Sequence, residues 1–272
     1  MYEKYWNLKE KPFKNTPDPD YLYCSREHEE AIARMMYTID EDMGGAVLTG
    51  VFGCGKTVIS QVLCVRLSSD KYQVAYINNP QLDYIDLLRA IVRKLKPVEL
   101  SSNKRELSTD ALLEHLENIL VNNANDGKKT VVIIDEAHII KDENIFESLR
   151  LLLNFQLKDR FLLSLLLFGQ PELKQSIQNN KQFEQRLAVK CNIGPFDQEN
   201  TSAYVLHRLS RSQNRERVIF TTDALKTIFD YSHGIPRRIN RICDLSLLVG
   251  CGSQLDSIDS NVVLEAVNMM GY

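Results

Sequence analysis

The chain has 272 residues, of which 44% are hydrophobic and 25% are charged, and its formal net charge is −3. This is the composition of an ordinary soluble globular protein, and the overall charge gives no reason to expect binding to nucleic acid or to an anionic membrane. A chain of this length can bury one large core, or one core and a smaller second domain.

The six cysteines form no C-x-x-C pair, so neither a zinc site nor a dithiol motif is predicted, and a reduced compartment is the simpler expectation. The N-terminus lacks the apolar region of a signal peptide, and the longest apolar run, at 161–168, is too short to cross a bilayer. We therefore expect a cytoplasmic protein without a transmembrane segment.

Residues 1–25 contain three prolines, four tyrosines and the single tryptophan, and they show little periodicity. The pattern predicts an irregular but ordered arm, followed by a helix over 26–42 with Ser25 as its N-cap. Phe13 and Tyr23 are candidates for contact with a nucleotide base. Packing of these aromatic side chains against a sheet edge fits the pattern equally well.

Residues 50–57 read G-x-x-x-x-G-K-T, between a predicted strand at 45–49 and a predicted helix at 58–67. In such a loop, backbone N–H groups and the helix N-terminus form a cradle for phosphate oxygens, and Lys56 adds a positive charge. A chance match in a turn is the alternative, so the rest of the chain must supply the other parts of a phosphate site.

The next segments alternate between strand and helix patterns. A strand is predicted at 73–78, a helix at 84–95 that ends before Pro97, a loop at 98–105, and a helix at 109–121 capped by Ser108 or Thr109. Strands that alternate with helices of this length indicate βαβ units and a parallel sheet.

Two carboxylates, Asp135 and Glu136, directly follow the apolar run 130–134, which predicts a strand buried on both faces. Ligands bind at the carboxyl edge of an open parallel sheet. Asp135 could hold Mg²⁺ together with the Thr57 hydroxyl, while Glu136 polarises an attacking water. A solvated turn is the alternative. Residues 135–138 also spell the helicase tetrapeptide DEAH, but the chain is too short for a two-domain helicase.

Further along the chain, a helix is predicted at 145–153 and a buried strand at 161–168. If that strand lies beside the acidic one, Gln170 would be level with Asp135 and could bind the γ-phosphate or the attacking water. A turn residue before a helix that starts at Pro171 is the alternative. Arg186 precedes a last strand at 188–193, where it could reach a neighbouring subunit's nucleotide or form a surface ion pair.

Only helices are predicted after residues 194–196, at 197–213, 222–232, 236–250 and 259–270, and they form a small cap. Arg237 follows Pro236 in the first turn of a helix. A cation there opposes the helix dipole, which indicates a nearby anion, either a nucleotide phosphate or a carboxylate. The cap also contains a group of arginines for which contact with nucleic acid is one interpretation and a solvated helix face is the expected one: Arg208, Arg211, Arg215 and Arg217.

Taken together, these motifs resemble the AAA+ ATPase family, and most closely the ATPase domain of general secretion pathway protein A. The resemblance covers nearly the whole chain. It is carried by ordered short motifs at 12–13, 16–19, 22–23, 28–31, 50–57, 135–137, 168–173, 185–187, 207–209 and 234–240.

The resemblance implies an α/β fold: a three-layer αβα P-loop NTPase (AAA+) core with a parallel sheet, followed by a small all-helical C-terminal lid. The expected regions are an N-terminal arm and helix at 1–43, the nucleotide-binding core at 44–195 and the lid at 196–272. It also implies ATP and Mg²⁺ as cofactors, and a homo-oligomeric ring or open spiral.

The same resemblance assigns roles to individual residues. Asp135 and Thr57 would hold the metal, Glu136 would be the base, and Gln170 and Arg237 would be the two sensors. Arg186 would be an arginine finger that acts on a neighbouring subunit. The nucleotide-binding residues would be Gly50, Val51, Phe52, Gly53, Cys54, Gly55, Lys56, Thr57 and Val58.

The implied function is an ATP-hydrolysing switch that acts on a protein partner in secretion, pilus or envelope assembly. Family members that act in secretion continue into a membrane helix and a peptidoglycan-binding region, so the secretion role is the least direct implication. A DNA-associated AAA+ regulator, of the kind that serves transposition or initiation, is the alternative, and a small-molecule P-loop kinase ranks third.

Cys54 stands where relatives usually have a residue such as threonine. A thiol among N–H groups at a helix N-terminus is expected to be reactive, and its alkylation to block ATP binding.

Overall fold

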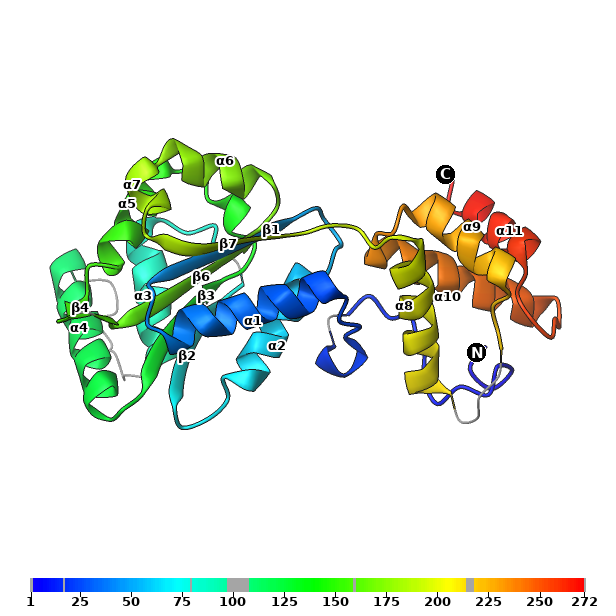
Figure 1. Cartoon of the computed structure of the whole chain (residues 1–272), viewed down its shortest axis with the longest axis horizontal. Coiled ribbons are helices and arrows are strands. Elements are labelled where there is room, and N and C mark those ends of the chain that lie inside the picture. The colour runs from blue at the N-terminus through cyan, green and yellow to red at the C-terminus, as the bar shows by residue number, and fades with distance from the viewer. Residues whose placement is uncertain are drawn as a thin grey trace. The chain divides into compact units, whose positions relative to one another are not determined.

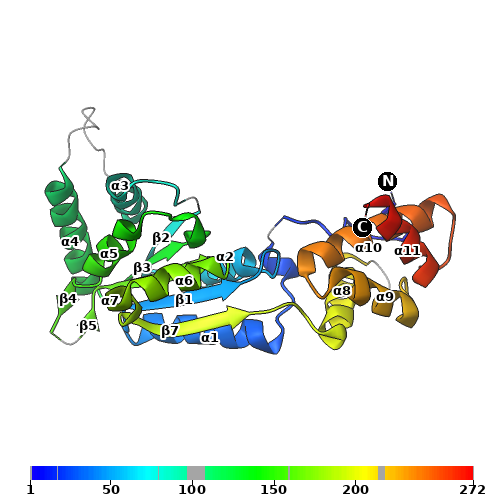
Figure 2. The same ribbon diagram turned by 90° about the horizontal axis from the view of Figure 1, so that it is seen from above.

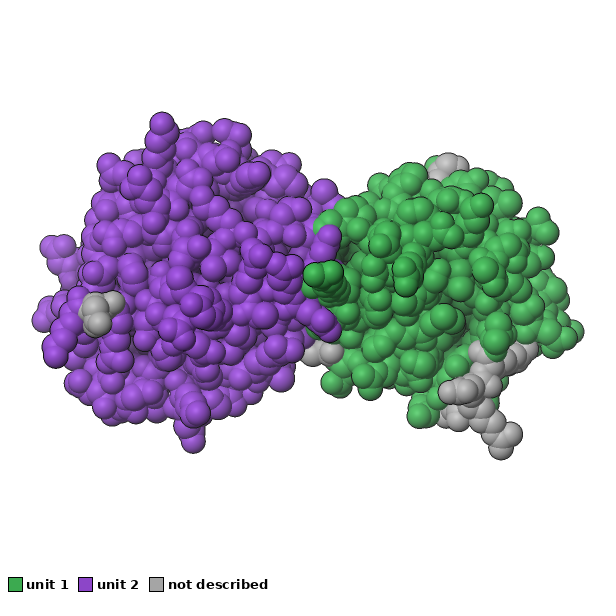
Figure 3. Space-filling model, in the orientation of Figure 1, with its two compact units in different colours: residues 1–26, 52–55, 194–272 green, residues 27–51, 56–193 purple. Residues whose placement is uncertain are grey.

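The computed structural model describes residues 2–16, 18–78, 80–96, 108–158, 160–213 and 218–271. It forms two compact units (Figure 3), which we describe separately. Unit 1 comprises Met1–Arg26, Phe52–Gly55 and Gly194–Tyr272, and unit 2 comprises Glu27–Val51 and Lys56–Ile193. Several features predicted from the sequence lie outside the described residues: Pro97, the loop at 98–105, Arg215 and Arg217.

Unit 2 is built on a five-stranded parallel sheet in the order β2-β3-β6-β1-β7 (Figure 1). The strands are β1 (Gly45–Gly50), β2 (Tyr72–Ile77), β3 (Lys129–Ile134), β6 (Leu163–Gly169) and β7 (Leu187–Ile193). The central strands β1 and β6 are buried along their whole length, as expected for continuous apolar runs covered on both faces.

The predicted strand at 161–168 differs from the observed one at its first two residues. Phe161 belongs to a separate antiparallel pair formed by β4 (Gln156–Leu157) and β5 (Arg160–Phe161), and β6 begins at Leu163. Periodicity alone could not place this break, because the apolar run continues through it.

The helices of this part of the chain largely follow the predicted ranges. They are α1 (Arg26–Asp40), α2 (Lys56–Arg66), α3 (Tyr84–Leu95), α4 (Thr109–Asn125), α5 (Glu143–Leu152), α6 (Glu172–Asn179) and α7 (Lys181–Glu184), with the short 3-10 helix η2 (Ala137–Ile139). Ser108 caps α4 by accepting from the backbone N–H of Ala111, as one of the two predicted caps. The P-loop helix begins at Lys56, two residues before the predicted start.

The sheet is covered on both faces. Alternate side chains on one face, such as Val132, Ile134 and Leu165, share a hydrophobic core with residues of α3 to α7. Figure 2 shows α3 and α4 on this side of the sheet and α1 on the other. The fold class is therefore the expected three-layer α/β arrangement.

The strand register brings the functional ends of the strands to one edge. Ile134 of β3 pairs with Ile77 of β2 and with Leu167 of β6, while Gly50 pairs with Ile193. Because all five strands are parallel, the residues that follow them, including Asp135, gather at the carboxyl edge of the sheet.

Unit 1 is helical. It contains η1 (Pro19–Tyr21), α8 (Gln198–Ser212), α9 (Thr222–Ser232), α10 (Pro236–Gly252) and α11 (Ser260–Met269). Its core also includes N-terminal side chains, namely Tyr2, Trp6, Leu8 and Phe13. The sequence analysis placed this arm in one region with the first helix, at 1–43. In the structure the arm packs among the helices of the C-terminal region.

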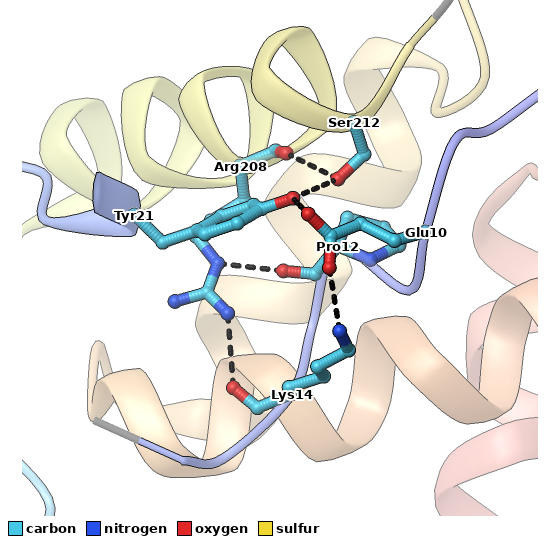
Figure 4. Close-up of polar contacts among 6 residues, drawn as sticks. All are labelled: Glu10, Pro12, Lys14, Tyr21, Arg208 and Ser212. Carbon is cyan, nitrogen blue, oxygen red and sulfur yellow. Dashed lines mark hydrogen bonds and ion pairs between the residues drawn. The ribbon is translucent and has the colours of Figure 1, made fainter. Parts of the chain in front are cut away.

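Arg208 joins this arm to α8 (Figure 4). Its guanidinium donates to the carbonyl oxygens of Pro12, at 2.6 Å, and Lys14, at 2.9 Å, and it lies 4.7 Å from the ring centroid of Tyr21. Arg208 is only 7% exposed, which corrects the expectation of a solvated face at this position. Arg211, one turn along, is exposed as expected.

Candidate functional site

The glycine-rich loop follows β1 and leads directly into α2. Gly53 and Gly55 have φ values of 87° and 96°, a left-handed backbone that glycine adopts at little cost. Lys56 is buried, and its Nζ donates to the carbonyl oxygens of Gly50, at 2.7 Å, and Val51, at 3.0 Å. The lysine ammonium is therefore held beside the backbone of its own loop.

The remaining residues of the predicted nucleotide site lie along this segment. Val51 and Phe52 are exposed, while Thr57 and Val58 are half-buried in the first turn of α2. Cys54 is fully buried, which argues against the reactive, reagent-accessible thiol that the sequence suggested.

Asp135 emerges from the end of β3 and is 2% exposed. Its Oδ2 accepts hydrogen bonds from the Tyr76 hydroxyl, at 2.9 Å, and the Ser60 hydroxyl, at 3.3 Å, and its Oδ1 accepts from the backbone N–H of Glu136, at 2.9 Å. Ser60 belongs to the P-loop helix and Tyr76 to β2, so three elements meet at this carboxylate. A buried carboxylate needs donors of this kind.

Burial and the neighbouring Asp135 carboxylate raise the pKa of the Tyr76 phenol, which therefore remains a hydrogen-bond donor. The sequence analysis did not select Ser60 or Tyr76. Tyr76 is an ordinary strand residue in the sequence, and only the pairing of β2 with β3 places it opposite Ile133 and near Asp135.

Mg²⁺ prefers oxygen ligands and is usually held by one or two carboxylates together with substrate phosphates. Asp135 and the Thr57 hydroxyl supply oxygens of this type. The single proton of the Ser60 hydroxyl lies between two acceptors, the Thr57 carbonyl at 2.9 Å and Oδ2 of Asp135 at 3.3 Å, so the first turn of α2 lies next to the carboxylate. In the described part of the chain, no cluster of three or more His, Cys, Asp or Glu side chains could hold a metal alone. The oxygens of Asp135 and Thr57 thus fit part of a Mg²⁺ site.

Glu136 directly follows Asp135 and adopts a left-handed conformation, with φ of 53° and ψ of 32°. Its Oε2 lies 3.5 Å from Nε2 of His138, and the same imidazole nitrogen lies 2.8 Å from the terminal nitrogen of Gln170. The structure therefore brings the predicted base and the predicted sensor to the same nitrogen of one histidine, which the sequence analysis had not assigned to the site.

The strand that carries Gln170 does lie beside the acidic strand, as the Gln170 prediction required. The register places Ile134 opposite Leu167, so Asp135 is level with Phe168 and Gln170 lies two positions further along. The expected alignment of Gln170 with Asp135 is thus corrected by two residues, and the residue that Gln170 contacts is His138.

Arg186 lies before β7, at the edge of the sheet where the strands begin. Its guanidinium donates to Oδ1 of Asn154, at 3.2 Å, and lies 6.0 Å from the Phe161 ring centroid. Asp135 and Glu136 lie at the other edge, and a six-residue strand spans about 20 Å. Arg186 therefore cannot reach the Asp135 edge of its own sheet.

Arg237 is the second residue of α10, as predicted, and belongs to unit 1 together with Phe52 and Gly53. Its backbone N–H donates to the Gly53 carbonyl at 3.4 Å, and its guanidinium lies 4.8 Å from the centroid of the Phe52 ring. A role as a phosphate sensor stays a prediction.

The two candidates for base contact have other roles in unit 1. Phe13 is 2% exposed and packs edge-on against Phe220, 6.3 Å away between centroids. Tyr23 packs against Phe196 and donates to Oδ1 of Asn200. Both side chains therefore pack within the helical core of unit 1, and neither of these contacts is with a sheet edge.

Comparison with known proteins identifies the family. The family model described as "AAA domain" matches residues 39–177, just over half of the chain. This chain belongs to the AAA family of ATPases. Among curated relatives of the ATPase, general secretion pathway protein A of Aeromonas hydrophila is 37% identical over 251 residues, which cover 91% of this chain and 44% of the relative. The chain thus spans less than half of that relative's length.

Solved structures support the AAA+ fold of this ATPase. The Aeropyrum pernix ORC2 protein, in ADPNP-ADP complexes, superposes with a TM-score of 0.73 at 19% identity, over 96% of this chain and 72% of that one. The Aeropyrum pernix ORC1 protein in complex with DNA gives a TM-score of 0.67 at 16% identity, over 97% and 70% of the two chains. At these identities the likeness shows the fold alone. Within the described residues, no helix of this AAA ATPase is long and apolar enough to cross a membrane.

Proposed function

We propose that this AAA protein binds ATP and hydrolyses it to ADP and phosphate. One contact carries the proposal: the Ser60 hydroxyl on the P-loop helix lies 3.3 Å from Oδ2 of the buried Asp135 carboxylate. The contact brings the phosphate-binding helix next to the acidic end of β3. Metal-assisted phosphoryl transfer requires these two parts to act on the same phosphates.

Each of the site residues predicted from the sequence has a proposed task. Lys56 and the N–H groups of residues 50–58 bind the phosphates, with Arg237 as a further cation. Asp135 and Thr57 would hold Mg²⁺, which neutralises charge on the transferred phosphoryl group. Glu136 accepts a proton from the attacking water, and Gln170 donates to the γ-phosphate or orients that water.

The test compares Glu136→Gln and Lys56→Ala with the wild-type protein. Glu136→Gln should bind ATP normally and lose at least about 100-fold in kcat, because only the base is removed. Lys56→Ala should weaken ATP binding. Glu114→Gln and Lys141→Ala, at exposed positions, serve as matched controls. Unchanged hydrolysis in Glu136→Gln would remove its assigned role, and unchanged ATP binding in Lys56→Ala would contradict the phosphate site.

We also propose that the protein works as a homo-oligomeric ring or spiral. The position of Arg186 supports this, because it lies at the amino edge of the sheet, opposite its own Asp135 edge, and as a catalytic residue it would have to act on a neighbour's site. Such a contact is heterologous, and repeating it generates a ring or a helix. Light scattering of Glu136→Gln with ATP should show a larger particle than without nucleotide.

The proposed partner is a protein of a secretion, pilus or envelope assembly, on the strength of the identity with general secretion pathway protein A. A DNA-associated regulator is the second candidate, favoured by the ORC1 structure, which was determined with DNA. Fluorescence anisotropy with duplex DNA separates the two. ATP-dependent binding that weakens steeply with salt would favour DNA. Absence of binding at low salt would favour the protein partner.

A further inference from the structure

His138 lies in the short helix η2, directly after Asp135 and Glu136, and close to the end of β6. Glu136 adopts a left-handed conformation, and η2, which follows it, packs against the end of β6. A Cβ atom at Gly169 would lie 3.1 Å from the His138 backbone nitrogen and 2.7 Å from the Leu173 side chain. Glycine at 169 therefore allows the close approach that puts the imidazole beside Gln170.

One nitrogen of His138 faces both catalytic candidates. Its Nε2 is 2.8 Å from the Gln170 amide and 3.5 Å from Oε2 of Glu136, and the His138 side chain is 14% exposed. Gln170 comes from the end of β6 and Glu136 from the end of β3, so the imidazole bridges two neighbouring strand ends.

The other nitrogen, Nδ1, is buried and has no hydrogen-bond partner among the described residues. If Nδ1 carried the proton of the neutral ring, a buried N–H donor would lack an acceptor. An orphaned donor of this kind is rarer in proteins than an orphaned acceptor. The surroundings therefore favour the tautomer with the proton on Nε2.

A proton on Nε2 decides which end of the Gln170 amide faces the histidine. Rotating the amide by half a turn exchanges its oxygen and nitrogen at nearly the same place, and Nε2–H needs an acceptor. The Gln170 oxygen then meets His138, and the amide NH₂ points away from it. A phosphate oxygen only accepts hydrogen bonds from such a group, so this orientation suits phosphate binding.

We propose that His138 is a positioning residue for hydrolysis, and the proposal rests on the function proposed above. Its Nε2–H donates to the Gln170 oxygen and holds the amide NH₂ toward the nucleotide. His138 itself touches neither ATP nor the attacking water.

Kinetics test this role. His138→Phe keeps the ring and removes both nitrogens, so kcat should fall about tenfold while the Kd for ATP changes less than about twofold. His138→Gln places an amide near the position of Nε2 and should recover part of kcat. His115→Phe, at an exposed position on α4, is the matched control.

A double-mutant cycle separates positioning from a general structural effect. If His138 acts through Gln170, His138→Phe should cost almost nothing further in a Gln170→Ala background. Full additivity, or a wild-type kcat in His138→Phe, would overturn the proposal.

Nitrogen NMR of histidine-labelled protein tests the contact without hydrolysis. The chain has five histidines, and His138→Phe assigns the signal. At about pH 8 an ordinary imidazole is neutral. The Nε2–H tautomer of His138 should then dominate, and its fraction should be smaller in Gln170→Leu. A dominant Nδ1–H tautomer would overturn the proposal. Lack of hydrolysis by the wild-type protein would instead refute the proposed function, and with it the catalytic consequence of this contact.

Discussion

The Tyr76 hydroxyl on β2 donates a 2.9 Å hydrogen bond to Oδ2 of Asp135, the residue that follows β3. Register explains the contact, because Tyr76 pairs with Ile133 and Ile77 with Ile134, which places the phenol near the strand end. The phenol remains a donor, since burial raises its pKa. Tyr76 thus fixes the orientation of the carboxylate that is proposed to hold Mg²⁺.

Removing this hydroxyl tests that role. In Tyr76→Phe the carboxylate keeps Ser60 and the Glu136 N–H as donors but loses its shorter side-chain bond, so we expect about a tenfold higher Mg²⁺ requirement for hydrolysis. The measurement is the ATPase rate as a function of Mg²⁺ concentration. Tyr72→Phe is the control, since Tyr72 lies on the same strand and its hydroxyl bonds to the exposed Asp40. Identical Mg²⁺ curves for both variants would contradict the assignment.

Arg186 lies at the amino edge of the sheet, so a catalytic arginine there must act on a neighbouring subunit. Neither Arg186→Ala nor Glu136→Gln should hydrolyse ATP alone. A mixture should regain part of the activity. The Glu136→Gln subunit still has its arginine and the Arg186→Ala subunit still has its base, so an interface with both groups forms only between the two variants. ATPase assays over a range of mixing ratios check this. Full activity of Arg186→Ala alone would assign the arginine to its contact with Asn154.

Arg208 should contribute strongly to the stability of unit 1. Arg208→Met keeps much of the stem but leaves the Pro12 and Lys14 carbonyls without their donor, so the free energy of unfolding should fall by about 2–4 kcal/mol. Trp6 reports on this unit, because it is the single tryptophan, is 1% exposed and donates to the Leu247 carbonyl. Denaturant unfolding followed by its fluorescence provides the measurement. Arg211→Met, at an exposed position on the same helix, should change little.

His207 should make the stability of unit 1 depend on pH. Burial, aided by the charges of Arg211 and Arg208, lowers its pKa below the ordinary value of 6.5. Below pH 6.5 the unfolded chain therefore takes up a proton before the folded one does. Stability should be full above that pH and should fall as the pH drops toward the lower folded pKa.

His207→Gln removes the titrating imidazole and so tests whether His207 causes the pH dependence of stability. The midpoint of thermal unfolding, read from Trp6 fluorescence, should fall less in the variant than in the wild-type protein between about pH 7 and 5.5. Parallel curves for the two proteins would exclude His207 as the source.

The sequence determined which segments of the chain form most of the strands and helices, and it showed the loop at 50–57 and the acidic pair at 135–136. These features depend on local periodicity and on glycine and capping chemistry. The resemblance carried by short motifs predicted the AAA+ fold, which the comparisons confirm. It also pointed to Gln170 and Arg186, whose roles stay predictions.

Only the tertiary structure decided which side chains meet. Tyr76 and Ser60 reach Asp135, and His138 joins Glu136 to Gln170, through pairings between segments far apart in the chain. Strand order and register set these contacts, and neither leaves a periodic signal in the sequence. The sequence likewise placed Arg208 on a helix. It could not show that the guanidinium donates to two carbonyl groups of the N-terminal arm.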